Sequence, residues 1–185
     1  MTMFPAEALS LIGATASMAL SSAGAYYGTA RSAASVASAA QRKPAIAYRC
    51  MVPIINAGVL AIYGPIVSII IVVRLGAAES LGAATGWTHL AAGLITGFSC
   101  LFSGLAIGRV GQSGIDAYCD SCFASAPEPA SRAPEVGPAT PLMQTEDPPA
   151  PLGNRSVYST LLLSLIFAEA IGLYGLIVGI ILLAT

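Results

Sequence analysis

The sequence predicts an all-α membrane protein whose four transmembrane helices arise from a duplicated helical hairpin. Three observations support this fold class: an apolar composition, four long apolar segments, and a motif that occurs twice. Hydrophobic types make up 56 % of the 185 residues and charged types only 9 %, whereas charged residues are about 25 % of an ordinary soluble domain. The mean hydropathy is +0.78. A soluble enzyme is therefore excluded, and the net charge of −1 gives no basic patch for nucleic acid.

The four apolar segments are long enough to cross a bilayer, which requires about 20 largely apolar residues per helix. We place these spans approximately at residues 8–30, 51–73, 87–110 and 157–183. No basic region precedes the first segment, only Glu7. We therefore expect this segment to be a retained span and not a cleaved signal peptide.

The distribution of basic residues predicts the orientation in the membrane. Most of them lie between the first and second spans or before the fourth: Arg31, Arg42, Lys43, Arg49, Arg132 and Arg155. Between the second and third spans there is only Arg74. By the positive-inside rule, we expect the 1–2 and 3–4 loops to be cytosolic and both termini to lie on the opposite side of the membrane. At that opposite end of the third span, we expect Trp87 to be an interfacial anchor and His89 to be a surface residue.

The loop over residues 115–156 is unlike the rest of the chain, because it holds eight of the twelve prolines and six of the nine acidic residues. Residues 125–151 include few large apolar side chains, so we expect this cytosolic loop to be disordered. A docking role and a tolerated insertion both remain open. Its single C-x-x-C pair, Cys119 and Cys122, is weak evidence for a metal site, so we predict no metal and two free thiols near the membrane surface.

The two halves of the chain repeat each other. Residues 61–67 in the second span align with residues 172–178 in the fourth at an offset of 111, and Gly24 and Gly28 align with residues 104 and 108 at an offset of 80. The chain is thus a duplicated hairpin with parallel repeats, unlike the inverted repeats of many transporters. We divide it into residues 1–114 with the first three spans, the loop 115–156, and residues 157–185 with the fourth span.

Glu169 is the acidic residue in the middle of a span. It lies 12 residues beyond Val157 and 14 before Leu183, which places it about 18 Å from either end of the helix. A charge at this depth costs about 2.5–3.5 kcal/mol on insertion scales, so the neutral acid is favoured until a cation approaches. We predict that Glu169 carries protons. The alternative is a protonated glutamate that only hydrogen-bonds a neighbouring helix. The other copy of the repeat has Gly58 at the equivalent position, so helix packing alone does not require an acid there.

Small residues predict how the helices pack. Gly24, Gly28, Gly104 and Gly108 lie in the first and third spans, and small residues allow close helix contact in lipid. An inner layer formed by these two spans and an ordinary four-helix bundle both fit this pattern.

The same segments resemble a known family, the proteolipid c subunits of vacuolar-type (V-type) rotary proton ATPases. The resemblance is carried by residues 165–178 of the fourth span, 52–64 of the second, 24–32 of the first and 104–108 of the third. It covers all four spans and omits the extreme N-terminus and the long loop. A sister proteolipid, c″, has its acid in the second span, where this chain has Gly58, so the resemblance is to the c or c′ type.

The resemblance implies a c-ring of such subunits in the membrane sector of the pump, with glycine-rich helices inside. Glu169 would carry one proton per subunit past the static subunit a, which supplies an arginine in trans. ATP hydrolysis in the soluble sector would drive rotation through a central stalk and subunit d. The chain itself would be non-catalytic, would need no cofactor, and would lie in a vacuolar or other acidic endomembrane.

Residues near the acid refine this expectation. Sodium-transporting relatives have Thr and Gln one turn before the tyrosine of the second span, whereas Val59 and Leu60 stand there in this chain, which favours protons. Tyr63 either hydrogen-bonds Glu169 or only packs. Asn56 bonds either the acid site or another helix. Pro65 should kink the second span because it removes a backbone donor.

Two other functions fit parts of the sequence. A four-span proton-coupled antiporter also depends on one membrane glutamate, but it needs a substrate cavity with aromatic residues and lacks this parallel duplication. A membrane-organising tetraspan would need no acid in the middle of a span, so it predicts that Glu169→Gln is silent.

Overall fold

The computed structural model describes residues 6–42, 44–77, 82–124 and 152–184, and this part of the chain is almost entirely helical. The long helices are α1 (Ala6–Arg42), α3 (Val52–Ala77), α4 (Ala83–Ala124) and α5 (Leu152–Ala184). The short helix α2 (Pro44–Ala47) and a 3₁₀ turn (Arg49–Met51) join α1 to α3. Each long helix contains a stretch that is long and apolar enough to cross a membrane. The predicted all-α, four-span fold is confirmed, and the protein is an integral multi-pass membrane protein.

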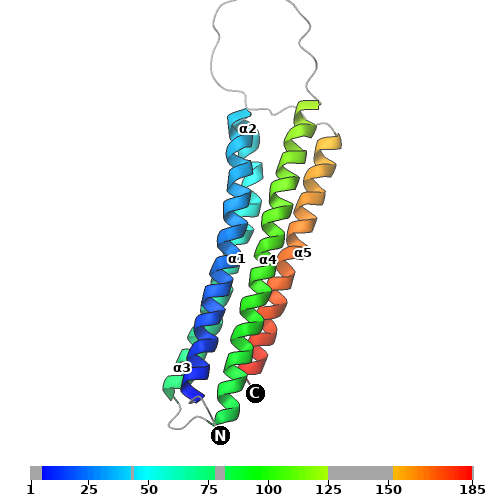
Figure 1. Cartoon of the computed structure of the whole chain (residues 1–185). Helices are drawn as coiled ribbons and strands as arrows, with labels where there is room; N and C mark the ends of the chain where they lie inside the picture. Colours follow the sequence, from blue (N-terminus) through cyan, green and yellow to red (C-terminus); the bar gives the residue numbers. More distant parts are fainter. Residues whose placement is uncertain (1–5, 43, 78–81, 125–151, 185) are drawn as a thin grey trace, which may run out of the picture.

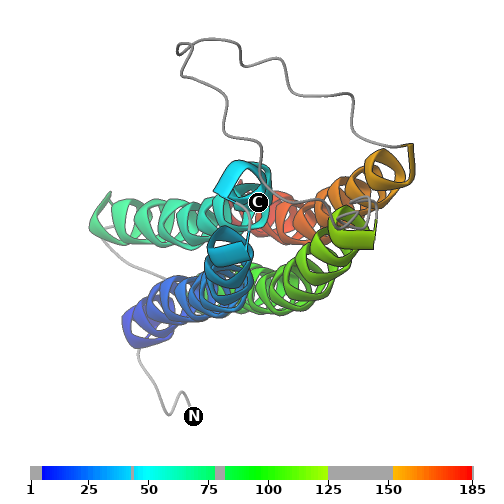
Figure 2. The same ribbon diagram turned by 90° about the horizontal axis from the view of Figure 1, so that it is seen from above.

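The four helices form two layers, with α1 beside α4 in one and α3 beside α5 in the other (Figure 2). Helices α1 and α4 run in one direction and α3 and α5 in the other (Figure 1). Each layer therefore contains the equivalent helix of both hairpin copies. The largest contact is between α1 and α4, the two glycine-rich helices, which we call the inner layer. This arrangement agrees with a separate glycine-rich layer, one of the two packings that the sequence left open.

Close contact between α1 and α4 depends on glycines that face each other. A Cβ atom on Gly24 would lie 2.6 Å from the carbonyl oxygen of Cys100, and one on Gly104 would overlap the backbone of Gly24. A Cβ atom on Gly28 would lie 3.0 Å from the carbonyl oxygen of Gly104, and one on Gly108 would lie 3.2 Å from Gly28 Cα. The two helices thus pack backbone against backbone, which side chains larger than hydrogen would prevent.

Gly104→Ala should therefore destabilise the folded chain by about 1–3 kcal/mol, the usual cost of overpacking a close contact. Gly58→Ala is the matched control, because a Cβ atom on Gly58 meets no atom within 4 Å. Thermal unfolding of the purified chain in detergent measures both. Equal melting temperatures for the two variants would contradict the close approach of α1 and α4.

Two of the helices continue well beyond the expected spans. Helix α4 reaches Ala124 and α5 begins at Leu152, so both ends of the loop expected over 115–156 are helical. Residues 125–151, where we expect disorder, lie outside the described residues. The extension of α4 packs against the end of α1 and the 3₁₀ turn before α3 through an apolar cluster: Ala39, Cys50, Ile115, Tyr118, Cys119 and Cys122.

This cluster contains the cysteine pair. Cys119 and Cys122 carry free thiols, as expected, and their side chains are buried inside the cluster, because α4 remains helical through both residues. No group of metal ligands forms among the described residues.

Candidate functional site

The structure brings Glu169 and Tyr63 together at the contact between α5 and α3. The Tyr63 hydroxyl donates a hydrogen bond to Glu169 Oε1 over 3.5 Å, which is at the long end of such contacts. The tyrosine side chain is 8 % exposed and belongs to the main apolar core. Tyr63 therefore both packs and contacts the carboxyl group, and these were the two roles that the sequence left open.

Glu169 lies at the boundary between this core and the outer surface of α5. On one side of it, Leu165 and Ala168 are buried against the other helices. On the other side, Ile166 and Phe167 are 59 % and 66 % exposed. Glu169 itself is half-buried. The carboxyl group is thus held by a packed neighbour on one flank and is reachable from the apolar outer surface on the other.

The outer surface of α5 is apolar over most of its length, because large hydrophobic side chains point away from the other helices. They are Leu163, Ile166, Phe167, Ile171, Leu173, Tyr174, Ile177, Val178, Ile180 and Ile181. Such a surface fits lipid or another apolar helix and does not fit water.

The first hairpin copy has no acid at the position that corresponds to Glu169. Gly58, the repeat equivalent, is exposed, and nothing lies within 4 Å of the position where its Cβ would be. Within the described parts of the four spans, Glu169 is therefore the carboxyl group that lies at mid-membrane depth.

Asn56 lies on the same helix as Tyr63. It lies seven residues before Tyr63 on α3, about 10 Å away along the helix axis. Among the described residues, the hydrogen bonds do not join its half-buried side chain to Glu169. Pro65 lies inside α3, which is helical on both sides of it.

Hydroxyl groups next to the site were not foreseen from the sequence. Ser21 on α1 donates a hydrogen bond to the carbonyl oxygen of Leu60, three residues before Tyr63. Ser103 on α4 donates to the carbonyl oxygen of Ala168, the residue before Glu169. The sequence feature that could have indicated these hydroxyl groups is a serine among the small residues of each glycine-rich span.

The expectation that His89 is a surface residue is wrong, because its side chain is only 2 % exposed. Ser10 of α1 lies over it, with 2.9 Å between the hydroxyl oxygen and Nδ1 of the ring. Trp87, which we expected to be an interfacial anchor, is 61 % exposed.

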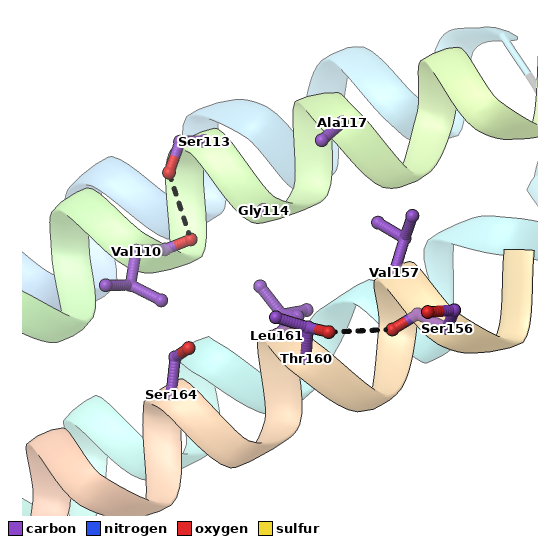
Figure 3. A pocket seen from close by; sticks show the side chains of 9 residues that line it. All are labelled: Val110, Ser113, Gly114, Ala117, Ser156, Val157, Thr160, Leu161 and Ser164. Atoms are coloured by element: carbon purple, nitrogen blue, oxygen red, sulfur yellow. Dashed lines mark hydrogen bonds between the residues drawn. The ribbon is translucent and has the colours of Figure 1, made fainter. Parts of the chain in front are cut away.

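A groove of about 460 Å³ separates α4 from α5 near the ends that the long loop joins (Figure 3). Its lining consists mainly of small and hydroxyl side chains: Val110, Ser113, Gly114, Ala117, Ser156, Val157, Thr160, Leu161 and Ser164. Several hydroxyls are bonded within their own helix, as Thr160 is to the Ser156 carbonyl oxygen at 3.0 Å. Ser164 and Glu169 are about 140° apart around α5 at 3.6 residues per turn. The groove therefore lies on a different flank of the helix from the carboxyl group.

Comparison with known proteins identifies the family. The family model that describes the C subunit of ATP synthase matches residues 12–71, 90–120 and 143–182, which include Tyr63 and Glu169. The 16 kDa proteolipid c subunit of the V-type proton ATPase from Nephrops norvegicus is 33 % identical over 170 residues, covering 92 % of this chain and 86 % of the relative.

Two further relatives agree with this assignment. The c′ subunit of the V-type proton ATPase from Saccharomyces cerevisiae is 33 % identical over 92 % of this chain and 84 % of its own length. The 16 kDa proteolipid c subunit of the V-type proton ATPase from Bos taurus is 33 % identical over 96 % of this chain and 92 % of its own. The chain therefore belongs to the ATP synthase C-subunit family, and its relatives are c and c′ proteolipids of V-type proton ATPases.

Proposed function

We propose that this chain is the proton-carrying proteolipid of the membrane sector of a V-type rotary ATPase, with Glu169 as the group that binds and releases the proton. The observation that carries the proposal is the position of this carboxyl group. It lies in the middle of an apolar helix, at the edge of an exposed apolar surface, and accepts a hydrogen bond from Tyr63. A carboxyl group placed in this way can remain neutral against lipid and ionise where a cation faces it.

The proton cycle follows from these two environments. Where α5 faces lipid, the protonated form of Glu169 is stable because it carries no charge. Beside a cationic side chain, the carboxylate becomes favourable, and the Tyr63 hydroxyl offers it a donor as the proton leaves. We assign the cation to an arginine of subunit a, supplied in trans.

The remaining parts of the proposal concern the assembly. Copies of this chain and other c-type proteolipids form a ring surrounded by membrane lipid. The central stalk and subunit d contact the cytosolic 1–2 and 3–4 loops, with both termini in the lumen of a vacuole or another acidic endomembrane compartment. The chain catalyses no reaction, since ATP is hydrolysed in the separate soluble sector. Rotation of the ring acidifies the compartment.

Purification of an affinity-tagged full chain in mild detergent tests the assembly. We expect untagged copies of the same chain, co-expressed with it, to co-purify in a particle of ring size together with the subunits of the soluble sector. The Gly58→Ala variant is a control that should assemble to the same extent as the wild type. Recovery of the tagged chain as a monomer from membranes that hold the intact pump would contradict the proposal.

A further inference from the structure

Hydroxyl groups of the inner layer hold the two helix turns that carry Tyr63 and Glu169. On the α1–α3 side, the Ser21 hydroxyl donates to the Leu60 carbonyl oxygen over 2.5 Å and accepts from the backbone N–H of Gly64 over 3.3 Å. Ser21 therefore bonds both partners of one helical hydrogen bond of α3. Tyr63 lies between these two residues.

The same arrangement recurs on the α4–α5 side. The Ser103 hydroxyl donates to the Ala168 carbonyl oxygen over 2.5 Å, and the Ser99 hydroxyl donates to the Ile171 carbonyl oxygen over 2.5 Å. These two carbonyl groups lie on either side of Glu169 in sequence. Side-chain hydrogen bonds from α4 thus fix the height and rotation of the turn that carries the carboxyl group.

Glycines on α3 and α5 allow the serines to reach those carbonyl groups. A Cβ atom on Gly64 would lie 2.6 Å from the Cβ of Ser21, and one on Gly175 would overlap the side chain of Ser99. The turn around Tyr63 is also weakened within its own helix. Pro65 has no N–H, so the carbonyl group four residues earlier loses its helical donor. The bonds from Ser21 therefore support a turn that α3 alone holds less firmly.

The hydrogen bond between Tyr63 and Glu169 is long enough to be sensitive to small movements. At 3.5 Å, a shift of a few tenths of an ångström decides whether the hydroxyl and the carboxylate interact, because hydrogen bonds weaken steeply beyond this distance. The two side chains come from different helices, α3 and α5. Contacts that set those helices relative to the inner layer therefore help to fix their separation, together with the direct contact between α3 and α5.

We propose that Ser21 and Ser103 are positioning residues for the proton-carrying carboxyl group, acting through the separation of Tyr63 and Glu169. The proposal rests on the proposed function of Glu169. Neither serine touches the carboxyl group. Each sets the turn that carries one member of the pair, and together they tune how readily Glu169 gives up its proton.

The test uses membranes that contain the assembled complex and a hydrophobic carbodiimide, which reacts with protonated carboxyl groups. Labelling of Glu169 is followed by mass spectrometry across pH. In the wild type, labelling should decrease as pH rises. In Ser21→Ala, the hydrogen bond from the Tyr63 hydroxyl to Glu169 should weaken, so the protonated form of Glu169 should persist to higher pH. Labelling at an alkaline pH should therefore rise about threefold, the effect of one typical interhelical hydrogen bond in a membrane. The double variant Ser21→Ala, Ser103→Ala should raise this labelling about tenfold if the free energies of the two effects add.

Two controls separate positioning from general packing. Thr96→Val removes a similar bond, from Thr96 to the Gly175 carbonyl oxygen at 3.2 Å, but at a carbonyl six residues beyond Glu169, and it should leave the pH profile unchanged. In a Tyr63→Phe background, Ser21→Ala should have no further effect, because the group through which it acts is absent.

The outcomes distinguish the two proposals. If wild-type labelling does not depend on pH, Glu169 does not titrate and the proposed function fails. If the wild type titrates but the Ser21 and Ser103 variants share its profile, or Thr96→Val shifts the profile equally, the positioning proposal fails while the function stands. Because each change removes only a hydroxyl or replaces one by a methyl group, we expect all variants to assemble.

Discussion

Sealed vesicles that contain the Glu169→Gln variant should show no ATP-driven acidification. Their internal pH should be the same with and without ATP. Glutamine preserves the size of the side chain and its neutral state in lipid, so assembly of the four helices should be retained. An amide has no proton to release near neutral pH, so transport should be lost entirely. Acidification is measured with a pH-sensitive dye after the amount of assembled complex has been matched.

Glu7→Gln is the control for this experiment. It makes the same chemical change at an exposed residue in the first turn of α1, far along the chain from the proposed site, and should acidify vesicles at the wild-type rate. Normal pumping by assembled Glu169→Gln would mean that the carboxyl group is structural. A membrane-organising tetraspan would then describe the chain better than a proton carrier.

Tyr63→Phe should slow proton transport by about three- to tenfold, which corresponds to the net value of one hydrogen bond, about 0.5–1.5 kcal/mol. The change removes only the hydroxyl that donates to Glu169 Oε1 and keeps the ring within the core. Without this donor the carboxylate is less stabilised, so the proton leaves more slowly. Initial rates of ATP-driven acidification at matched complex levels measure the effect.

The duplication supplies the matched control. Tyr174 is the repeat equivalent of Tyr63 and is 65 % exposed on the outer surface of α5. Tyr174→Phe should pump at the wild-type rate, because within the described part of the chain it is the Tyr63 hydroxyl that bonds the acid. Equal slowing of both variants would show that loss of a membrane tyrosine, and not loss of the donor to Glu169, accounts for the effect.

The sequence predicted the parts of this structure that depend on local composition. Spans appear as long apolar segments because lipid excludes unpaired polar backbone, and all four fall within helices that could cross a membrane. The offsets of 80 and 111 aligned the two copies, Glu169 was identified as the acidic residue in the middle of a span, and Tyr63 lies in the motif that repeats. Their contact was left open because an offset does not give the rotation of one helix against another.

Features that depend on tertiary contact were not predictable in this way. Helix α4 continues to Ala124 because its extension buries an apolar face against the end of α1 and the 3₁₀ turn before α3, whereas hydropathy marks only the part inside the membrane. His89 was expected at the surface because it lies near the end of a span, but the first turns of α1 cover it. Ser21 resembles any other small residue until the carbonyl group that it bonds is known.

Infrared difference spectroscopy of the purified, lipid-embedded complex tests the central claim most directly, since it observes protonation of the carboxyl group itself. Spectra are recorded between acidic and alkaline pH for the wild type and Glu169→Gln. We predict a protonated-carboxyl band that the wild type loses as pH rises and that the variant lacks at every pH. A band that persists in the variant, or a wild-type band that does not respond to pH, would contradict the assignment of Glu169 as the proton carrier.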